Sequence, residues 1–219
     1  MPGISHHRRN GALRTHDIPA VRMRILVPTL LLGLTACTAH QAPPSDAVLT
    51  VTGGSNLQFR KVASTIPPGP VTGAPGLSRQ STNAAEQTAA AQSLDCAQGN
   101  PASVDVKAVP TLPLVGCNPF DSSRVVLDPA FMTGTEADTV AAALENGQWV
   151  LNLAFKAEGA RIFGDFTGRN VNEQVAIVVG DRVLSAPSIQ SAILDGHVQI
   201  TGKFTEADAV GLAHAIAGS

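Results

Sequence analysis

Residues 175–205, which read VAIVVGDRVLSAPSIQSAILDGHVQITGKFT, decide the fold of this chain. The opening run, VAIVV, is continuously apolar and rich in β-branched residues, which is typical of a strand buried on both faces. Gly180-Asp181 separates it from a second apolar run and predicts a two-residue hairpin, in which Gly180 supplies the positive φ of the first turn position. Pro187 has no N–H to donate in a hydrogen bond between strands, so the second strand should end near it.

A returning strand and a helix complete this stretch. After Gly196, polar and apolar residues alternate, which places Val198 and Ile200 on one face of a strand. Thr205, with Asp208 three positions later, predicts the start of a helix that Gly218 ends.

The residues before 175 show weaker patterns that predict further helices and strands. Apolar spacing predicts helices within 83–92, from Thr135 to Gly147 and within 159–166, and strands are expected at 48–52, 57–62, 125–127 and 149–155. The sequence therefore predicts an α+β fold, with a mostly antiparallel sheet of four to five strands and about three helices packed on one face.

Composition limits the classes of partner. The 219 residues are 44% hydrophobic, enough for one core. Residues 1–36 hold five Arg and one Asp, so the remainder carries 10 basic against 16 acidic side chains. An acidic protein of this kind lacks the clustered Lys and Arg that nucleic acids require, and it lacks a polybasic patch for an anionic membrane surface.

The N-terminal residues predict export and a lipid anchor. Residues 25–34 form a short apolar run behind a basic flank. A membrane span needs ~20 residues, so this run fits the core of a secretory signal instead. Leu34-Thr35-Ala36-Cys37 resembles the bacterial lipobox, in which the Cys sulfur takes a diacylglycerol; the alternative is a chance Cys after an apolar run. We expect a signal peptide at 1–36 and a flexible tether at 37–47, and the start codon is either Met1 or Met23.

Removing Cys37 leaves Cys96 and Cys117, an even pair in an exported chain. Outside the cytosol such a pair is usually a disulfide, and a loop of this length contributes ~3 kcal/mol to stability in the chain-entropy model. A zinc site is the alternative, although two Cys without neighbouring Cys or His cannot fill four positions.

The chain divides into four parts after the signal peptide. Following the tether, residues 48–66 read as a short strand pair, and 67–93 as a Pro, Gly, Ser and Ala-rich linker with a helix near its end. Residues 94–219 then form the α+β domain.

The line AIVVGDRVLSAPSIQSAILDGHVQITGKFTEADAVGLAHAIAG, residues 176–218, resembles the first periplasmic head domain of the bacterial protein-export subunit SecD. LQFRKV, at 57–62, is similar to the strand that opens the SecD periplasmic region. The family usually carries Asp-Gly where this chain has Gly180-Asp181, which changes the expected hairpin turn from type I′ to type II′. The resemblance implies the binding module of an export subunit without its proton-driven membrane part.

Catalytic chemistry is not indicated. Ser185, Asp181 and His197 are the residues from which a hydrolase triad would have to be built, but no Gly-x-Ser-x-Gly elbow surrounds Ser185. We expect no metal, no cofactor and no small-molecule substrate. A binding surface is expected along a semi-apolar segment that runs beside a sheet edge and could accept an added peptide strand; the alternative is that the segment simply packs on a helix. Its residues are Ser185, Ala186, Pro187, Ile189, Ile193 and Leu194.

Two functions follow from these observations. The first is a non-enzymatic, lipid-anchored protein on the extracytoplasmic face of the cell membrane that binds exported polypeptides or Sec translocase components. The alternative is an envelope lipoprotein that reuses the same head fold for another partner or ligand.

Overall fold

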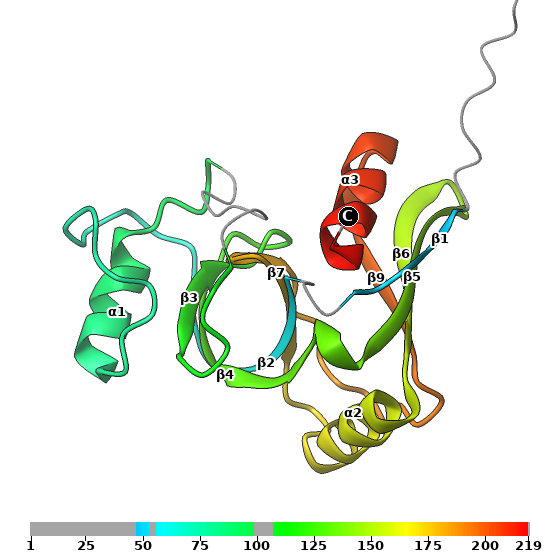
Figure 1. Cartoon of the computed structure of the whole chain (residues 1–219). Helices are drawn as coiled ribbons and strands as arrows, with labels where there is room; N and C mark the ends of the chain where they lie inside the picture. The colour runs from blue at the N-terminus through cyan, green and yellow to red at the C-terminus, as the bar shows by residue number, and fades with distance from the viewer. Residues whose placement is uncertain (1–46, 53–55, 99–106, 219) are drawn as a thin grey trace, which may run out of the picture. The chain divides into compact units, whose positions relative to one another are not determined.

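The strands of this protein are divided between two antiparallel sheets (Figure 1). The computed structural model describes residues 47–52, 56–98 and 107–218, all within one compact unit, 42–219. The expected signal peptide and Cys37 lie outside the described residues, as does all of the expected tether except its last residue.

The first sheet has four strands in the order β1 (Val48–Thr50), β5 (Ala137–Glu145), β6 (Gln148–Phe155) and β9 (His197–Phe204). The second has five in the order β3 (Leu114–Cys117), β4 (Arg124–Thr133), β2 (Leu57–Ile66), β7 (Val175–Val179) and β8 (Arg182–Ser185). The helices are α1 (Ala84–Ser93), α2 (Ala157–Arg169) and α3 (Glu206–Ala217), with a 3-10 turn η1 at Gly134–Glu136. The α+β class is confirmed, but two sheets replace the single sheet that we expected.

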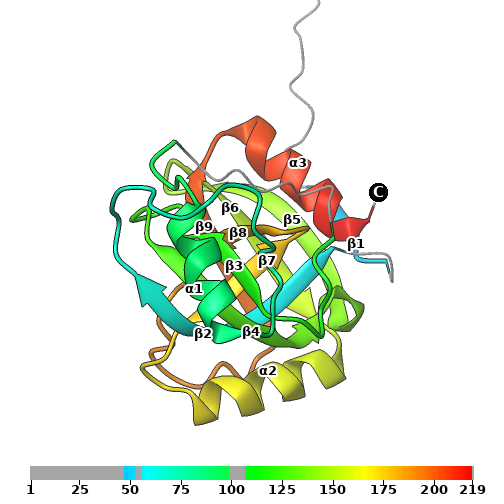
Figure 2. The ribbon, with the colours of Figure 1, turned by 90° about the vertical axis from the view of Figure 1, so that its left-hand side faces the viewer.

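The main core lies between the two sheets, with α3 above it and α2 below it (Figures 1 and 2). Phe59 of β2 is fully buried there and meets the rings of Phe155 and Phe163 edge-on, at centroid distances of 5.3 Å in each case. A stripe on α3 that includes Leu212 and Ile216 packs into the same core. The helices therefore do not all cover one face: α1 packs separately, on β3 and β4.

The β7–β8 hairpin matches its prediction. All five residues of β7 are buried; Ile177 faces the main core, whereas Ala176 and Val178 face a second cluster inside the curled five-stranded sheet. Gly180 has a φ of 66°, and Asp181 is not among the described non-glycine residues with positive φ, which agrees with the expected type II′ turn. β8 ends at Ser185, two residues before Pro187.

The predicted helix from Thr135 to Gly147 is wrong, because this segment is strand β5. β5 pairs with β1 on one side and with β6 on the other. Asn146 and Gly147 have φ values of 50° and 78°, which is the type I′ turn of a two-residue hairpin. The apolar residues of this Ala-rich segment match both the helical and the strand period. Pairing of β5 with β1 and β6 outweighs the helix propensity of its alanines.

The expected strand pair at 48–66 does not form as a pair. β1 joins β5 in the four-stranded sheet, whereas β2 runs between β4 and β7 in the other sheet. The first part of β2 is buried on both faces, with Leu57 and Phe59 in the main core and Val62 in the second cluster, whereas residues 63–65 are exposed.

The segment expected to be a linker is hydrogen-bonded to the five-stranded sheet. Val115 N–H of β3 donates to Arg79 O at 2.8 Å, and Arg79 Nε donates back to Val115 O at 2.7 Å. The Arg79 guanidinium also pairs with the Asp181 carboxylate at 2.8 Å, and burial is the main reason that the pKa of Arg79 is lowered. Helix α1 begins as predicted, with Asn83 Oδ1 accepting from Ala85 N–H at 2.9 Å. This segment therefore covers the outer edge of β3.

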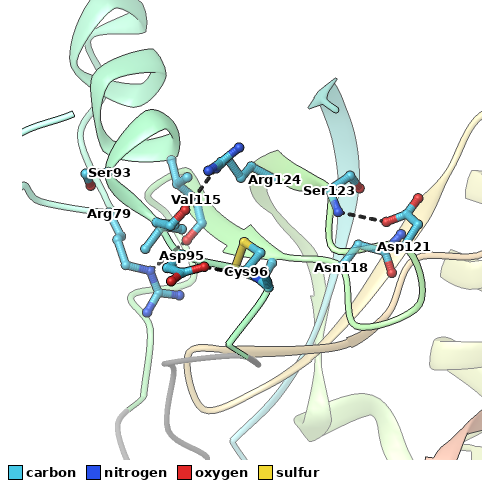
Figure 3. Close-up of a disulfide and its surroundings, with 12 residues drawn as sticks. Arg79, Ser93, Asp95, Cys96, Val115, Asn118, Asp121, Ser123 and Arg124 are labelled. Carbon is cyan, nitrogen blue, oxygen red and sulfur yellow. Dashed lines mark hydrogen bonds between the residues drawn. A yellow bond between two sulfur atoms is a disulfide. The ribbon is translucent and has the colours of Figure 1, made fainter. Parts of the chain in front are cut away.

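The structure contains the predicted disulfide between Cys96 and Cys117, whose Cα atoms lie 5.4 Å apart (Figure 3). Cys117 is the last residue of β3, and Cys96 follows α1. Arg124 Nε donates to Leu94 O at 2.9 Å beside it. The bond thus holds α1 against the edge of the five-stranded sheet.

A buried arginine supports the inside of that sheet. Arg60 has no exposed surface, and its donors go to neutral acceptors: Gln58 Oε1 and the carbonyls of Val109, Leu112 and Asp128, at 2.6–3.0 Å. Burial lowers the pKa of Arg60 to about 10, so the group still carries its charge at neutral pH. Arg60 therefore fixes the residues around 109–112 against the sheet.

Candidate functional site

The expected binding segment divides into a buried part and an exposed part. Ser185, Ala186 and Ile189 are buried, whereas Pro187 is exposed. Backbone hydrogen bonds fix this part beside β7: Val175 N–H donates to Pro187 O at 3.1 Å, and Ile189 N–H donates to Glu173 O at 2.8 Å. Only part of the predicted surface is therefore available to a partner.

The second half of the segment packs on helix α2, as the alternative interpretation expected. Ile193 is half-buried, and its N–H donates to the buried Thr167 Oγ1 at 3.0 Å. A Cβ at Gly164 would lie 3.0 Å from Leu194 Cδ2, so the helix approaches this segment closely. Leu194 nonetheless keeps 74% of its surface exposed.

The accessible part of the segment borders a groove between strands β8 and β9. A hollow of about 300 Å³ lies between Pro187 on one side and Gln199 and Thr201 on the other. A second hollow of about 280 Å³ shares Pro187 and Gln199 and continues toward His197, and a smaller one lies at the opposite end, beside Phe204. We call this feature the β8–β9 groove; its residues are Asn118, Phe120, Ser185, Ala186, Pro187, Gln199 and Thr201.

Both strands along the groove are sheet edges. β8 pairs only with β7, and β9 pairs only with β6, among the strands that the structure describes. The two strands belong to different sheets, and no described ladder joins them. An extended segment lying in the groove would therefore meet strand backbone on both sides.

Phe120 stands at the rim of the groove and was not found by sequence reasoning. It is 46% exposed, and the loop that carries it is ordered by its own hydrogen bonds. Phe120 N–H donates to Asn118 Oδ1 at 3.2 Å. Ser123 N–H donates to Asp121 Oδ1 at 2.9 Å (Figure 3). The signal in the sequence was an aromatic residue between Pro119 and Asp121, inside a stretch of turn residues.

Charge is confined to one end of the groove. Its middle is lined by amide, hydroxyl and apolar side chains. Arg182, Lys203 and Asp208 lie at the Phe204 end, where hydrogen bonds from Thr205 lower the pKa of the Asp208 carboxyl. A neutral middle suits the backbone and small side chains of a peptide.

The structure gives no support for a hydrolase triad. Asp181 lies in the turn before β8 and Ser185 is the last residue of β8, so the two are about 13 Å apart at the usual strand rise. The Asp181 carboxylate pairs with Arg79, and Ser185 is buried. The described residues also contain no group of three or more His, Cys, Asp or Glu side chains that could hold a metal ion.

Comparison with known proteins places the second half of the chain. The family model of the SecDF P1 head subdomain matches residues 116–219. Residues 116–219 form a SecDF P1 head subdomain. The family resemblance predicted for this half of the chain is thereby confirmed, and the β8–β9 groove lies entirely within the P1 head.

Curated relatives of the P1 head are SecD proteins. The protein translocase subunit SecD of Mycobacterium tuberculosis is 33% identical over 112 residues, covering 49% of this chain and 20% of that protein. SecD of Acidaminococcus fermentans is 41% identical over 83 residues, covering 37% of this chain and 20% of that protein. This chain thus matches about a fifth of the length of these relatives.

A solved structure of SecDF, a membrane component described as enhancing protein export, resembles the chain at 23% identity with a TM-score of 0.45. The likeness covers 80% of this chain and 64% of that one. Within the described residues, no helix has the length and apolar character needed to cross a membrane.

Proposed function

We propose that this protein is a lipid-anchored, extracytoplasmic P1 head that binds extended polypeptide in the β8–β9 groove and acts in protein export without being an enzyme. The observation that carries the proposal is the groove itself, with a strand edge on each side and a neutral middle. The relatives named above are protein translocase subunits, which supports an export partner. The lipobox at Cys37 supports the anchor.

The dimensions of the groove suit a peptide in extended form. β9 has eight residues, a length of about 27 Å at the usual strand rise. Backbone hydrogen bonds to a strand edge accept many sequences, whereas pockets for alternate side chains add preference. Phe120 and Pro187, both exposed at the rim, offer apolar contacts for such side chains. We therefore expect broad selectivity, as a protein that receives many exported chains requires.

Photocrosslinking in cells tests the proposal. A photoreactive amino acid at the exposed Gln199 is expected to crosslink to exported polypeptides, whereas the same amino acid at Val171, exposed after helix α2, is not. Thr201→Arg would fill the middle of the groove from an exposed position and should abolish the Gln199 crosslinks. Crosslinks of equal strength from both sites would overturn the proposal.

The identity of captured partners separates the two functions. Sec translocase components or exported chains crosslinked through Gln199 support the export role. Capture through Gln199 of one other envelope protein, without exported chains, would replace it with the alternative of a reused head fold. Mass spectrometry of Cys37 tests the anchor independently, since a diacylglyceryl group is expected on its sulfur.

A further inference from the structure

The loop that carries Phe120 takes its shape from hydrogen bonds between its own residues. Asn118 N–H donates to Ser123 O at 2.9 Å, and Ser122 N–H donates to Asn118 O at 3.0 Å. Two further bonds to side-chain oxygens complete residues 118–123. These bonds join loop residues to one another, so they fix the shape of the loop and not its position beside strands β8 and β9.

The strand that leads into this loop approaches β8 closely without pairing with it. β3 is an edge strand, and the described residues form no ladder between β3 and β8. A Cβ at Gly116 would lie only 2.7 Å from Val183 Cγ2, so the absence of a side chain lets the two strands meet. Beyond Gly116, Phe120 lines a hollow of about 70 Å³ together with Leu184 of β8 and Phe204 of β9. The place of the ring at the groove therefore depends on what holds β3 toward β8.

The base of the loop is tied on both strands to the segment that precedes β3. We call residues 67–96 the α1 segment. Cys117, the last residue of β3, is bonded to Cys96 at the end of this segment. Arg124 lies opposite Cys117 in the ladder, and its Nε donates to Leu94 O at 2.9 Å (Figure 3). Both residues are buried, so the α1 segment holds the two strands where the loop begins and ends.

Arg79 of the α1 segment also joins β3 to the turn before β8. Its backbone carbonyl and its Nε bond to the N–H and the carbonyl of Val115 in β3. Its guanidinium donates to Asp181 Oδ2 at 2.8 Å and to Asp181 O at 2.6 Å. The two side chains are only 19% and 21% exposed, so solvent screens this ion pair less than a pair at the surface. One arginine thus spans the gap that no described ladder closes.

We propose that the α1 segment positions the Phe120 loop at the β8–β9 groove, with Arg79 and the Cys96–Cys117 disulfide as positioning residues for polypeptide binding. The inference rests on the proposed function, because it concerns how that same site is built. A ring that is held in place before binding loses less freedom when a polypeptide side chain packs on it. The α1 segment precedes residue 116, where the match to the P1 head begins, so a part of the chain before the matched residues sets the rim of the groove.

The position of the loop is measured first, without any added polypeptide. The full chain carries the photoreactive amino acid p-benzoylphenylalanine in place of Phe120, and crosslinks within the chain are mapped by mass spectrometry. Crosslinks to β9 are expected, because Phe120 and Phe204 line one hollow. Cys96→Ser with Cys117→Ser should lower their yield severalfold, since the loop then loses its tie to the α1 segment.

A second variant retains the disulfide and applies where its removal unfolds the chain. Arg79→Gln with Asp181→Asn removes the ion pair without leaving a charge unpaired, and it should also lower the crosslinks to β9. The matched control is Arg161→Gln with Glu158→Gln, which removes an exposed ion pair on α2 and should leave the crosslinks unchanged. Circular dichroism melting identifies the variants that fold. Unchanged crosslinks in either folded test variant would overturn the inference.

Binding of an unfolded polypeptide tests the consequence for the groove. The probe is reduced, carboxamidomethylated α-lactalbumin that carries a fluorophore, and its affinity for the full chain is measured by fluorescence anisotropy. Loss of the disulfide should weaken binding about tenfold in the parent, but less than about twofold in a chain that already carries Phe120→Ala. The difference is expected because the disulfide acts through the ring. Equal weakening in the two backgrounds, or none in the parent, would overturn the inference.

Failure of the proposed function gives a different result. If the parent does not bind the probe, or if Thr201→Arg leaves binding unchanged, the groove is not the polypeptide site and the proposed function is overturned. The crosslinks from position 120 need no polypeptide, so in that case they alone decide whether the α1 segment positions the loop.

Discussion

The two sheets of this protein differ in how many of their faces are buried. The five-stranded sheet packs one face on the main core and the other on an interior cluster that includes Leu127 and Val178. The four-stranded sheet packs one face, with Val140 and Leu151, and leaves small and polar residues such as Ala141 and Gln199 on the other. Double burial makes the five-stranded sheet the stable support, and single burial leaves the four-stranded sheet with a surface that a partner can reach.

The same contrast extends to what reinforces each sheet. The five-stranded sheet has a buried arginine and a disulfide, whereas the hairpin of the four-stranded sheet relies on turn geometry and on a capped helix packed behind it. Changes in the five-stranded sheet should therefore cost more free energy of unfolding than changes in the four-stranded sheet.

The largest effect is expected from Arg60→Leu. The change removes the donor to the buried Gln58 Oε1 and to the part-buried carbonyls of Leu112 and Asp128, and one of two donors to the Val109 carbonyl, which should lower the free energy of unfolding by roughly 3–5 kcal/mol. Urea unfolding followed by circular dichroism measures it. Arg161→Leu is the control, since Arg161 is an exposed arginine on α2 paired with Glu158 and Asp165, and it should change stability by less than ~1 kcal/mol. Equal losses for the two would remove Arg60 as the support of the five-stranded sheet.

Removal of the disulfide should have the second-largest effect on the free energy of unfolding. Cys96→Ser with Cys117→Ser opens a loop with a sequence separation of 21 and should cost about 3 kcal/mol of unfolding free energy. Hydrogen exchange should accelerate first in α1 and β3, which the bond joins, with β6 and β9 less affected. Acceleration that is uniform across both sheets would contradict a local role for the bond.

The β5–β6 turn gives a smaller effect that distinguishes strand from helix. Gly147→Ala places a side chain at a φ of 78° and should destabilise the protein by about 1 kcal/mol. Gly211→Ala lies inside helix α3 with open space around it, and should instead stabilise by ~0.5–1 kcal/mol. Thermal melting of the two variants gives the comparison; a stabilising Gly147→Ala would mean that residues 137–145 do not pair as observed.

The smallest effect should come from the cap of α3. Thr205 Oγ1 accepts from Asp208 N–H at 3.2 Å, and the Asp208 carboxylate accepts from Thr205 N–H at 3.0 Å. Asp208→Asn should cost about 0.5 kcal/mol at pH 7, because the site is exposed and screened by solvent.

The pH dependence of this cap has a defined sign. Hydrogen bonds from Thr205 lower the pKa of Asp208 from its ordinary value of 3.8, so its contribution is present above about that pH and is lost as the pH falls through the lower, folded value. The difference between the parent and Asp208→Asn should therefore shrink between pH 7 and pH 3 in urea unfolding. Glu206→Gln, which leaves the capping box intact, is the control.

Two elements show how far the sequence could predict the fold. β7 was predicted correctly, because its apolar run is short, rich in β-branched residues and followed directly by a two-residue turn. β5 was predicted as a helix, because its alanines match a helical stripe as well as an alternating strand. The Asn146-Gly147 dipeptide was the available signal for a hairpin, and we had interpreted Gly147 only as a helix end.

The candidate site was predictable in one half only. The sequence placed Pro187 and its neighbours beside a sheet edge, which the structure also shows. Phe120, Gln199 and Thr201 lie far from Pro187 along the chain, and only packing of the two sheets brings them to one groove. Patterns among neighbouring residues carry no information about which distant segments will contact each other.

The sequence by itself determined the α+β class, the β7–β8 hairpin, the capped final helix and the pairing of the two cysteines, because each depends on residues close in the chain or on a count of residue types. Tertiary structure alone decided that the strands form two sheets, that β5 is a strand and that two edges enclose a groove. The physical reason is that a strand is completed by a partner elsewhere in the chain, whereas a helix or a tight turn is completed by its own neighbours.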